Sequence, residues 1–548
     1  MSNRKFNWDL FWGFLIVLAA FLLIFTDGLN VIQYRMLYYD DAYNATVAAN
    51  FIRYGEYRVS FPDDITFYNP ITTGITAILP AALLFKLFGI SSFTASLTPL
   101  LYGVFNLWLF WYLLSICLAS KSKHNYSLSA VFAVLLILAC YVYQMICENL
   151  WGETASCTFQ LLAAIFMRKH LSNHKLSYMA WSGAMVAMAF LTKSAMIFFM
   201  TVWFTVILIE AFYTRSITKK AARSWYLGWA GGFIFTDAFK FYQLGGFIPY
   251  LRWWKHEWIN MMTQSAGHGD KPSIPVKIES LSTLFYNNCY FSLAIIGIAA
   301  VLYFIIVYRS HKQKKQPDHD LLSMSIYGVG GASLLVYYIL FGGNGLMHRT
   351  RLSIYILFIK MLIVFLLCLL IIHIVKQIRN RNNTIFSRPK VIGQSILAIV
   401  TCCLLFPYEY LNRNINMYIE KTDDYSYEQK LVTEFLGEVD ALPEDATLYV
   451  AAWWHVPHVT LYLDRKMTSI YEKKPVDYNK GYFLVGISIE AFNVALVEEV
   501  LNAHLVRIDT SEVDYSQLPP YPRQDLEIYA IYKVEPKEAI IEELVNEE

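Results

Sequence analysis

Charged residues are scarce in this 548-residue sequence: Lys, Arg, Asp and Glu together occupy 16% of the positions, whereas 56% are hydrophobic. A soluble enzyme carries more surface charge, so the composition excludes an ordinary soluble protein and favours a polytopic α-helical membrane protein. The sequence also lacks a basic stripe or a recognisable reader motif, which argues against a nucleic-acid partner.

Cysteine is rare as well, with eight residues in all and none after Cys403. Almost all lie inside or at the ends of apolar runs without the spacing of a zinc site or a disulfide framework, which indicates small apolar residues packed in helices. Only Cys147 and Cys289, near the expected outer surface, are placed where they could meet. A glycine-rich phosphate loop and internal repeats are also missing. The sequence therefore implies no certain cofactor, and a divalent metal is left as an option.

Long apolar runs are what the sequence has in abundance. A transmembrane helix needs about 20 predominantly apolar residues. By this rule spans are expected near residues 10–32, 96–118, 128–146, 154–167, 177–192, 195–213, 225–243, 284–308, 322–342, 351–375 and 391–408. Basic residues gather in the loops at 121–123, 168–175, 215–223, 309–315 and 376–381, which places these loops in the cytoplasm. About 11 spans result, with the C-terminus outside.

The orientation depends on whether two further apolar runs cross the membrane. The run 75–88 is nearly long enough to cross, and we expect it to be an interfacial helix because crossing would put Lys121 and Lys123 outside. The run 10–32 is too long for a signal-peptide core and lacks a convincing cleavage site. It is expected to be a retained first span of a multi-pass protein of the cytoplasmic membrane, with Arg4 and Lys5 holding the N-terminus in the cytoplasm.

The first outer loop, residues 33–95, carries two adjacent carboxylates, Asp40 and Asp41, where the first span meets water. Residues 42–54 have the pattern of a short helix that Gly55 would end, with one apolar face lying along the membrane surface. Acidic residues at a membrane mouth predict a functional site. The alternative is simple capping of the helix, which needs only one Asp.

Other polar residues expected on the outer face are Glu148, Glu153, Lys193, His348, Arg349 and Arg351. For Lys193 and Arg349 the alternative to function is snorkelling to water, and for Glu153 it is an acid at a helix start. His256, Glu257, His268 and Asp270 match no metal signature. His455 and His458 are expected on a solvated helix, and Trp453 and Trp454 suit either a sugar platform or a core.

After residue 408 the composition changes, and residues 409–548 are expected to form a soluble extracytoplasmic α/β domain. Helices are predicted at 425–439, 455–463 and 487–501, and strands at 446–453, 481–485, 505–508 and 526–532. This alternation favours a small, largely parallel sheet covered on both faces. Residues 1–408 are then the transmembrane catalytic domain.

If the substrate at this outer membrane mouth is a lipid-linked sugar, these residues supply what the transfer of that sugar requires. A polyprenyl phosphate departs without needing a proton, so one carboxylate, Asp40 or Asp41, is enough to deprotonate the acceptor hydroxyl. Arg349, Arg351, Lys193 and His348 are the cations available to neutralise charge on the phosphate. Glu153 would position a sugar hydroxyl, pair with a cation or help to hold a divalent metal.

The motifs resemble the GT-C class of membrane glycosyltransferases, and within it the protein O-mannosyltransferase and lipid A aminoarabinose transferase group. The resemblance covers roughly the membrane part to residue 408. It depends on these segments, in this order: Asp40-Asp41-Ala42-Tyr43 with Ala48, Ala49, Asn50 and Gly55; Asn69-Pro70-Ile71-Thr72-Thr73-Gly74; Leu79-Pro80-Ala81; Leu84-Phe85-Lys86-Leu87-Phe88-Gly89; Trp151-Gly152-Glu153; Ala187-Met188-Ala189-Phe190-Leu191-Thr192-Lys193; and the turn around Arg349.

The resemblance implies an inverting transfer from a polyprenyl-phosphate sugar to an acceptor hydroxyl of a glycan, lipid or protein. It implies Asp40 as the base with Asp41 beside it, where many relatives have Glu, and substrate binding by Glu153, Asn69 and Tyr43. The aminoarabinose transferases have Lys at the position of Asn69, which makes a lipid A substrate doubtful.

Three other readings stay open at this point. One is a polysaccharide polymerase or ligase that uses a polyprenyl-diphosphate oligosaccharide and depends on outer-face Arg and His. The second is a transporter of lipid-linked sugars, which would need ionisable groups near the middle of the membrane. The third is a binding or sensing protein that displays its tail on a retired enzyme core.

Overall fold

The computed structural model describes residues 7–264, with gaps around 35–38, 61–72, 123 and 139–148, and most of 430–536, with gaps around 451–455, 472–475, 486–493 and 510–529. Short fragments are described near 324–333 and 361–375. Contacts divide the chain into two compact units: residues 1–28, 72–77 and 99–417, and residues 29–71, 78–98 and 418–548.

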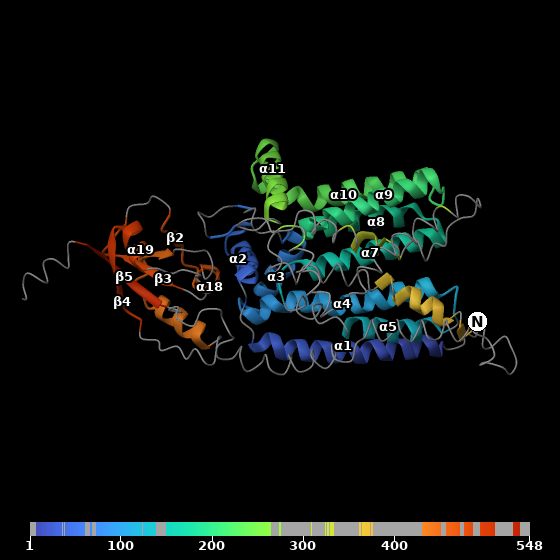
Figure 1. Ribbon diagram of the computed structural model, residues 1–548, viewed down its shortest axis with the longest axis horizontal. Helices are drawn as coiled ribbons and strands as arrows, with labels where there is room; N and C mark the ends of the chain where they lie inside the picture. The colour runs from blue at the N-terminus through green and yellow to red at the C-terminus, as the bar shows by residue number, and fades with distance from the viewer. Residues whose placement is uncertain are drawn as a thin grey trace, which may run out of the picture. The chain divides into compact units, whose positions relative to one another are not determined.

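The first unit is a helical bundle. Its helices are α1 (Trp8–Tyr34, to residue 28), α4 (Ser92–Leu118, from residue 99), α5 (Asn125–Leu138), α7 (Glu153–Asn173), α8 (Leu176–Thr192), α9 (Ile197–Leu208), α10 (Lys219–Gln243) and α11 (Phe247–Gln264). A short 3-10 turn η1 (Ser194–Met196) precedes α9, and a π-helical turn η2 (Ile209–Tyr213) follows it. Helices α7, α8 and α10 run side by side, with α8 in contact with both neighbours (Figure 1).

Small residues let α8 and α10 approach closely. A Cβ added at Gly183 of α8 would lie 2.0 Å from the carbonyl oxygen of Trp225, and one added at Gly228 of α10 would lie 1.9 Å from that of Ala180. In a bilayer, where lipid tails are as apolar as the side chains, such close backbone packing is a main source of helix association.

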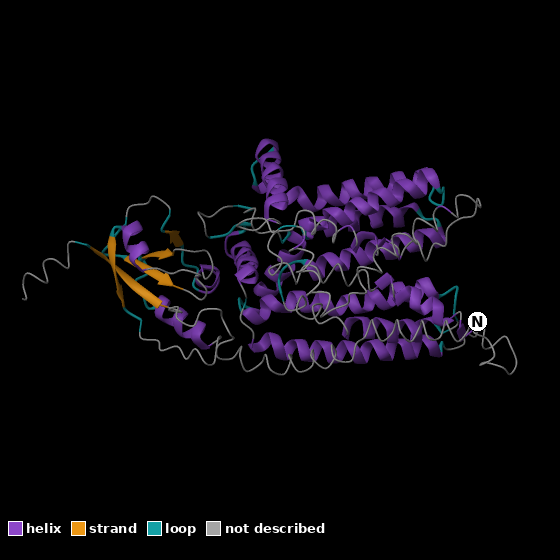
Figure 2. Cartoon of the chain, in the orientation of Figure 1, coloured by secondary structure: helices purple, strands orange, loops and turns teal. Residues whose placement is uncertain are grey.

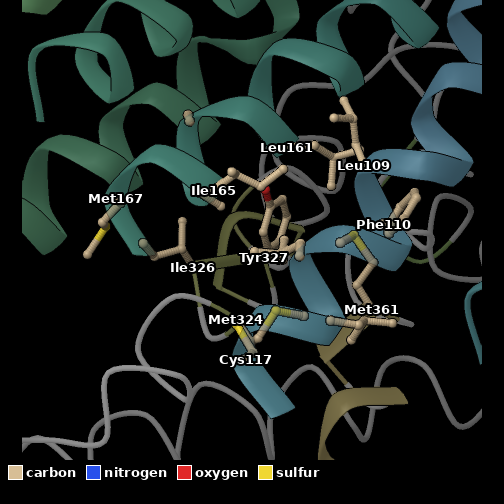
Figure 3. Close-up of a cluster of buried hydrophobic side chains, with 14 of the residues drawn as sticks. Leu109, Phe110, Cys117, Leu161, Ile165, Met167, Met324, Ile326, Tyr327 and Met361 are labelled. Atoms are coloured by element: carbon tan, nitrogen blue, oxygen red, sulfur yellow. The ribbon is translucent and has the colours of Figure 1, made fainter. Parts of the chain in front are cut away.

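The bundle is held by one large apolar cluster that α4, α7 and two later fragments share (Figure 3). Tyr327 lies fully buried among side chains such as Phe110, Leu161 and Ile165, and its hydroxyl donates to the carbonyl oxygen of Gln160 at 2.8 Å. The polar end of this buried ring is therefore satisfied within the core, as a water-free site requires.

Two helices are long and apolar enough to cross a membrane, Trp8–Gln33 and Ser92–Leu118, and four shorter apolar helices accompany them among the described residues: Ile75–Phe88, Asn125–Ile137, Leu176–Thr192 and Ile197–Tyr213. Each predicted span up to residue 243 overlaps a helix, the one at 128–146 as far as residue 138, beyond which it lies outside the described residues, so the helical character is confirmed. Of the four spans predicted after residue 283, the one at 351–375 is described as helix over most of 361–375, and the other three lie wholly or largely outside the described residues. The number of about 11 spans therefore stays a prediction.

In the second unit, helix α2 (Tyr39–Tyr54) begins three residues before the predicted helix and ends where predicted. Gly55 closes it with a φ of 73° and donates its N–H to the carbonyl oxygen of Phe51 at 2.9 Å, a left-handed C-terminal cap. Residues 41–50 are all buried, polar Asn44 and Asn50 included. The prediction of a single buried face is therefore wrong for residues 41–50, which are buried all round, while the location of α2 along the membrane surface stays a prediction.

Helix α3 (Ile75–Phe88), which begins in the first unit and continues in the second, coincides with the second short helix that the sequence predicts. It has 14 residues, with Pro80 inside it. Its interfacial location stays a prediction.

Residues 430–536 contain a five-stranded sheet with the order β2-β1-β3-β5-β4 (Figure 2). The strands are β1 (Thr447–Val450), β2 (Met467–Ser469), β3 (Gly481–Val485), β4 (Ala503–Arg507) and β5 (Ala530–Pro536), with helices at 430–440, α18 (Val456–Tyr462) and α19 (Val494–Leu501). Strand β1 pairs parallel with β2 and β3, whereas β5 pairs antiparallel with β3 and β4. The expected largely parallel sheet is therefore wrong: the sheet is mixed.

Two apolar clusters cover the two faces of this sheet. One contains Leu448, Val450 and Leu484 together with Leu431 and Phe435 of the helix at 430–440. The other contains Tyr449, Phe483 and Val485 with residues of α19. Alternate residues along each strand thus face opposite layers, which is the periodicity of a sheet buried on both sides.

Candidate active site

Three of the motifs that carry the family resemblance meet in the first unit, although they lie far apart in the sequence. They are the end of the motif Asn69–Gly74 at Thr73 and Gly74, the turn Trp151-Gly152-Glu153, and Thr192-Lys193 at the end of α8. Thr73 forms an isolated antiparallel bridge with Lys193, and its hydroxyl donates to the carbonyl oxygen of Trp151 at 2.9 Å. The N–H of Gly74 donates to the carbonyl oxygen of Thr192 at 2.8 Å. We call this meeting point the three-motif site.

A buried ion pair lies at the centre of the three-motif site. The Nζ of Lys193 is 3.1 Å from Oε1 of Glu153 and donates to the carbonyl oxygen of Trp151 at 2.9 Å. The two side chains are only 5% and 4% exposed. The Trp151 carbonyl therefore accepts from both Thr73 and Lys193, which uses both of its lone pairs.

The helices place these charges favourably. Glu153 is the first residue of α7, where the helix N-terminus carries a partial positive charge, and Lys193 is the C-cap of α8, where the partial charge is negative. Each helix end thus stabilises the charge next to it as well as the pair itself. Lys193 is both paired and hydrogen-bonded, whereas neither carboxylate oxygen of Glu153 has a hydrogen bond among the described residues, so the ion pair and the helix N-terminus are what offset the burial of Glu153.

Glycines make the close approach at this site feasible. A Cβ on Gly74 would lie 1.7 Å from the carbonyl oxygen of Leu191 and would clash with the backbone of α8. Gly152 has a φ of 84°, a left-handed conformation that other residues adopt at a cost, and a Cβ there would lie 2.9 Å from the carbonyl oxygen of Thr192. Only glycine fits at either position.

Hydrogen bonds behind the site fix the start of α7. The amide of Asn106 on α4 donates to the carbonyl oxygen of Thr154 at 2.9 Å and accepts from the hydroxyl of Thr158 at 2.6 Å. The hydroxyl of Ser156 donates to the carbonyl oxygen of Ala189 on α8 at 3.0 Å. Residues that support a site through such buried, satisfied bonds hold it in one geometry.

The predicted catalytic pair belongs to the second unit, on α2. Asp40 is in the first turn of the helix, and its side chain lies outside the described residues. The side chain of Asp41 is fully buried, and Tyr43 is 5% exposed. The assignment of a catalytic role to either carboxylate stays a prediction.

Several predicted site residues lie outside the described residues: Asn69, His348, Arg349, Arg351, Glu148, His268, Asp270, Trp453, Trp454 and His455, as does the Cys147 and Cys289 pair. Among the described residues no group of three or more His, Cys, Asp or Glu side chains could hold a metal ion. His256 is exposed on α11, whereas the neighbouring Glu257 is buried.

The prediction for His458 in the C-terminal region is also wrong, and the contacts of this residue could not be inferred from the sequence. His458 was expected on a solvated helix, but only 5% of it is exposed, and its Nε2 lies 2.8 Å from the carbonyl oxygen of Leu37. Arg53, at the end of α2, forms an ion pair with Asp464 at 3.2 Å. Sequence spacing gives no signal for partners that are more than 400 residues apart.

Comparisons with known proteins agree with this architecture. Residues 75–236 match the family model described as dolichyl-phosphate-mannose-protein mannosyltransferase, which spans the three-motif site apart from Thr73 and Gly74. No curated protein sequence matches the chain. The family match confirms the resemblance to GT-C membrane glycosyltransferases and the predicted enzyme class, a glycosyltransferase with a lipid-linked donor.

Solved structures add the fold. The crystal structure of ArnT from Cupriavidus metallidurans bound to undecaprenyl phosphate aligns with a TM-score of 0.53 and 11% identity, covering 95% of this chain and 97% of that one. The archaeal oligosaccharyltransferase AglB from Archaeoglobus fulgidus, in complex with an inhibitory peptide and a dolichol-phosphate, aligns with a TM-score of 0.45 and 10% identity, covering 86% of this chain and 70% of that one. The first likeness shows a shared polytopic membrane fold, and the second is too weak to carry an argument.

Proposed function

We propose that this GT-C-like protein is an inverting glycosyltransferase that moves a sugar from a polyprenyl-phosphate donor to an acceptor hydroxyl on the outer side of the cytoplasmic membrane. The observation that carries the proposal is the three-motif site: most of it lies within the segment matched by the mannosyltransferase family model. The undecaprenyl phosphate bound to the ArnT structure, which shares the fold, is in keeping with a lipid-phosphate donor.

In the proposed mechanism Asp40 removes the proton from the acceptor hydroxyl as it attacks the anomeric carbon, and the bond from that carbon to the phosphate oxygen breaks. The leaving phosphate is a weak base and keeps the electron pair without needing a proton. Cations lower the barrier by neutralising the charge that gathers on it. We assign that work to Arg349, with His348 and Arg351 beside it.

The buried residues receive supporting roles in this proposal. Lys193 already shares its charge with Glu153 in a pair that solvent hardly reaches, so we assign the pair to holding the chain at Thr73 in place. Tyr43 and Asp41 are covered by protein and would act by shaping α2. Asn69 stays assigned to the substrate, and the acceptor is a glycan, lipid or protein hydroxyl.

The test uses purified full-length protein in nanodiscs of bacterial lipids. The donors are undecaprenyl phosphate carrying radiolabelled mannose, glucose or galactose, and the acceptors are cell-envelope fractions of a strain that lacks the protein. We expect transfer from one donor, and its loss by about 100-fold or more in Asp40→Asn with donor binding retained, because the amide cannot take a proton. Transfer at the normal rate by Asp40→Asn would refute the mechanism.

The Arg349→Ala variant separates this mechanism from a polyprenyl-diphosphate polymerase or ligase. Loss of activity in Arg349→Ala combined with full activity in Asp40→Asn would favour the polymerase or ligase. Release of no sugar from any of the three donors, together with their movement across the bilayer, would favour a transporter.

A further inference from the structure

Helix α18 of the C-terminal region packs along helix α2, which carries the Asp pair (Figure 1). Both helices belong to the second compact unit, and they are separated by about 400 residues of sequence. Contacts between them occur at both ends of α2 and leave the Asp pair between the two points of attachment.

At the beginning of α2 the contact is made by His458. Its Nε2 lies 2.8 Å from the carbonyl oxygen of Leu37, three residues before Asp40, and both residues are buried. A carbonyl oxygen only accepts hydrogen bonds, so Nε2 carries the proton and donates it. Burial lowers the pKa of His458 to about 4, which keeps the imidazole neutral at physiological pH. The donor is therefore fixed in type and direction.

At the end of α2 the contact is made by Arg53 and Tyr54. The guanidinium of Arg53 donates to the carbonyl oxygens of Leu461 at 2.8 Å and Thr460 at 3.2 Å, in the last turn of α18 where carbonyls lack helical partners. It also pairs with Asp464 at 3.2 Å. The hydroxyl of Tyr54 donates to the second carboxylate oxygen of Asp464 at 2.6 Å.

We propose that α18 is a clamp that positions α2 for catalysis, with His458 and Arg53 as positioning residues for Asp40. This proposal rests on the proposed function, in which Asp40 is the base. A helix held at both ends presents its first turn in one orientation. A general base needs that precision, since the proton it takes must lie within hydrogen-bonding distance.

The clamp gives the C-terminal region a role in the reaction without bringing any of its residues to the substrate. When His458 no longer donates, the chain at Leu37 loses its fixed point and Asp40 samples several orientations. We expect kcat to fall about 10- to 100-fold, as it does when a reacting group is misplaced by about 1 Å, while KM for the donor stays unchanged.

The test compares three histidine variants of the full-length protein in nanodiscs. His458→Leu removes the donor with little change in volume, and His458→Gln keeps an N–H donor on a side chain of similar reach. His504→Gln is the control variant. His504 on β4 pairs with Glu498 on α19, in the same domain but away from α2. The turnover assay uses the undecaprenyl-phosphate sugar that the unaltered protein transfers in the panel above.

A second readout needs no sugar donor. Hydrogen exchange followed by mass spectrometry measures the protection of amides in α2 and, separately, in β1 and β3. We expect His458→Leu to raise exchange in α2 alone, and His458→Gln to restore both protection and most of kcat. His504→Gln should match the unaltered protein in both assays.

Two outcomes would overturn the clamp. One is normal turnover and normal α2 protection in His458→Leu. The other is loss of protection in β1 and β3 together with α2, both in His458→Leu and in Arg53→Met, because the contact would then only hold the domain folded. If no donor in the panel is transferred, the proposed function fails, and the exchange experiment still decides whether α18 holds α2.

Discussion

The buried pair of Lys193 and Glu153 predicts a large loss of stability when one partner alone is removed. At 3.1 Å the Coulomb attraction is about 5 kcal/mol for an effective dielectric constant of about 20. Each side chain is at most 5% exposed, so solvent screens little of it. In Lys193→Met the carboxylate of Glu153 stays buried without its cation, for which the expected cost is about 3–5 kcal/mol.

The double variant Lys193→Met with Glu153→Gln is the matched control. It leaves no uncompensated charge, and its cost should be smaller than that of Lys193→Met alone, because replacing both members of a buried pair is often close to neutral. The comparison also separates the pair from the lost hydrogen bond to Trp151, which both variants lack.

The assay is thermal unfolding of the full-length protein in detergent, followed by the loss of monodisperse protein on size exclusion. We expect the apparent Tm to fall by about 5–10 °C in Lys193→Met and to recover at least half of that in the double variant. Equal Tm values for the unaltered protein and Lys193→Met, or a double variant less stable than the single one, would refute the argument.

Three further changes have definite expected results. Gly74→Ala, whose Cβ would lie 1.7 Å from a carbonyl oxygen of α8, should abolish the folded protein on size exclusion, whereas Gly231→Ala on α10, with nothing within 4 Å, should raise stability by about 0.5–1 kcal/mol. Burial depresses the pKa of His458 in the folded protein to about 4, so on acidification the unfolded chain takes up this proton at a higher pH than the folded protein does. Acidification from about pH 6.5 to about pH 4 should therefore remove about 3 kcal/mol of stability, measured as urea unfolding of the unaltered protein. The His458→Gln variant should lack this pH-dependent loss. Asp237→Ala removes the carboxylate that accepts from the Tyr250 hydroxyl at 2.6 Å and the Trp254 indole N–H at 3.0 Å, both on α11. Loss of these two bonds should expose α11 to limited proteolysis, and unchanged cleavage would contradict this.

Apolar run lengths in the sequence predicted where helices occur but not always where they begin. The span predicted at 177–192 is helix Leu176–Thr192, because that helix is apolar to both ends. The span predicted at 225–243 lies within helix Lys219–Gln243, which begins six residues earlier. The first turns of this helix are basic, so a search for apolar runs does not include them. The hydroxyl of Thr218, which accepts from the N–H of Ala221 at 3.1 Å, marks that start by capping rather than by apolarity.

Long-range partners were beyond the reach of the sequence. The motifs at Thr73, Gly152 and Lys193 were recognised one by one, but nothing in their spacing says that they touch. Strand direction in the C-terminal sheet escaped for the same reason, since burial on both faces gives parallel and antiparallel strands the same apolar pattern. The burial of His458 could not be predicted either, because its hydrogen-bond partner, the carbonyl oxygen of Leu37, lies 421 residues away in the sequence.

The contact between α2 and α18 can form only late in the synthesis of the chain. Residues 37–54 leave the ribosome more than 400 residues before their partners at 458–464. At about 5–20 residues per second, the early segment waits roughly 20–80 seconds for its partner. Under the proposed mechanism a product truncated before residue 458 would carry Asp40 without the contacts that position it, so sugar transfer by nascent chains would be slower than transfer by the finished protein.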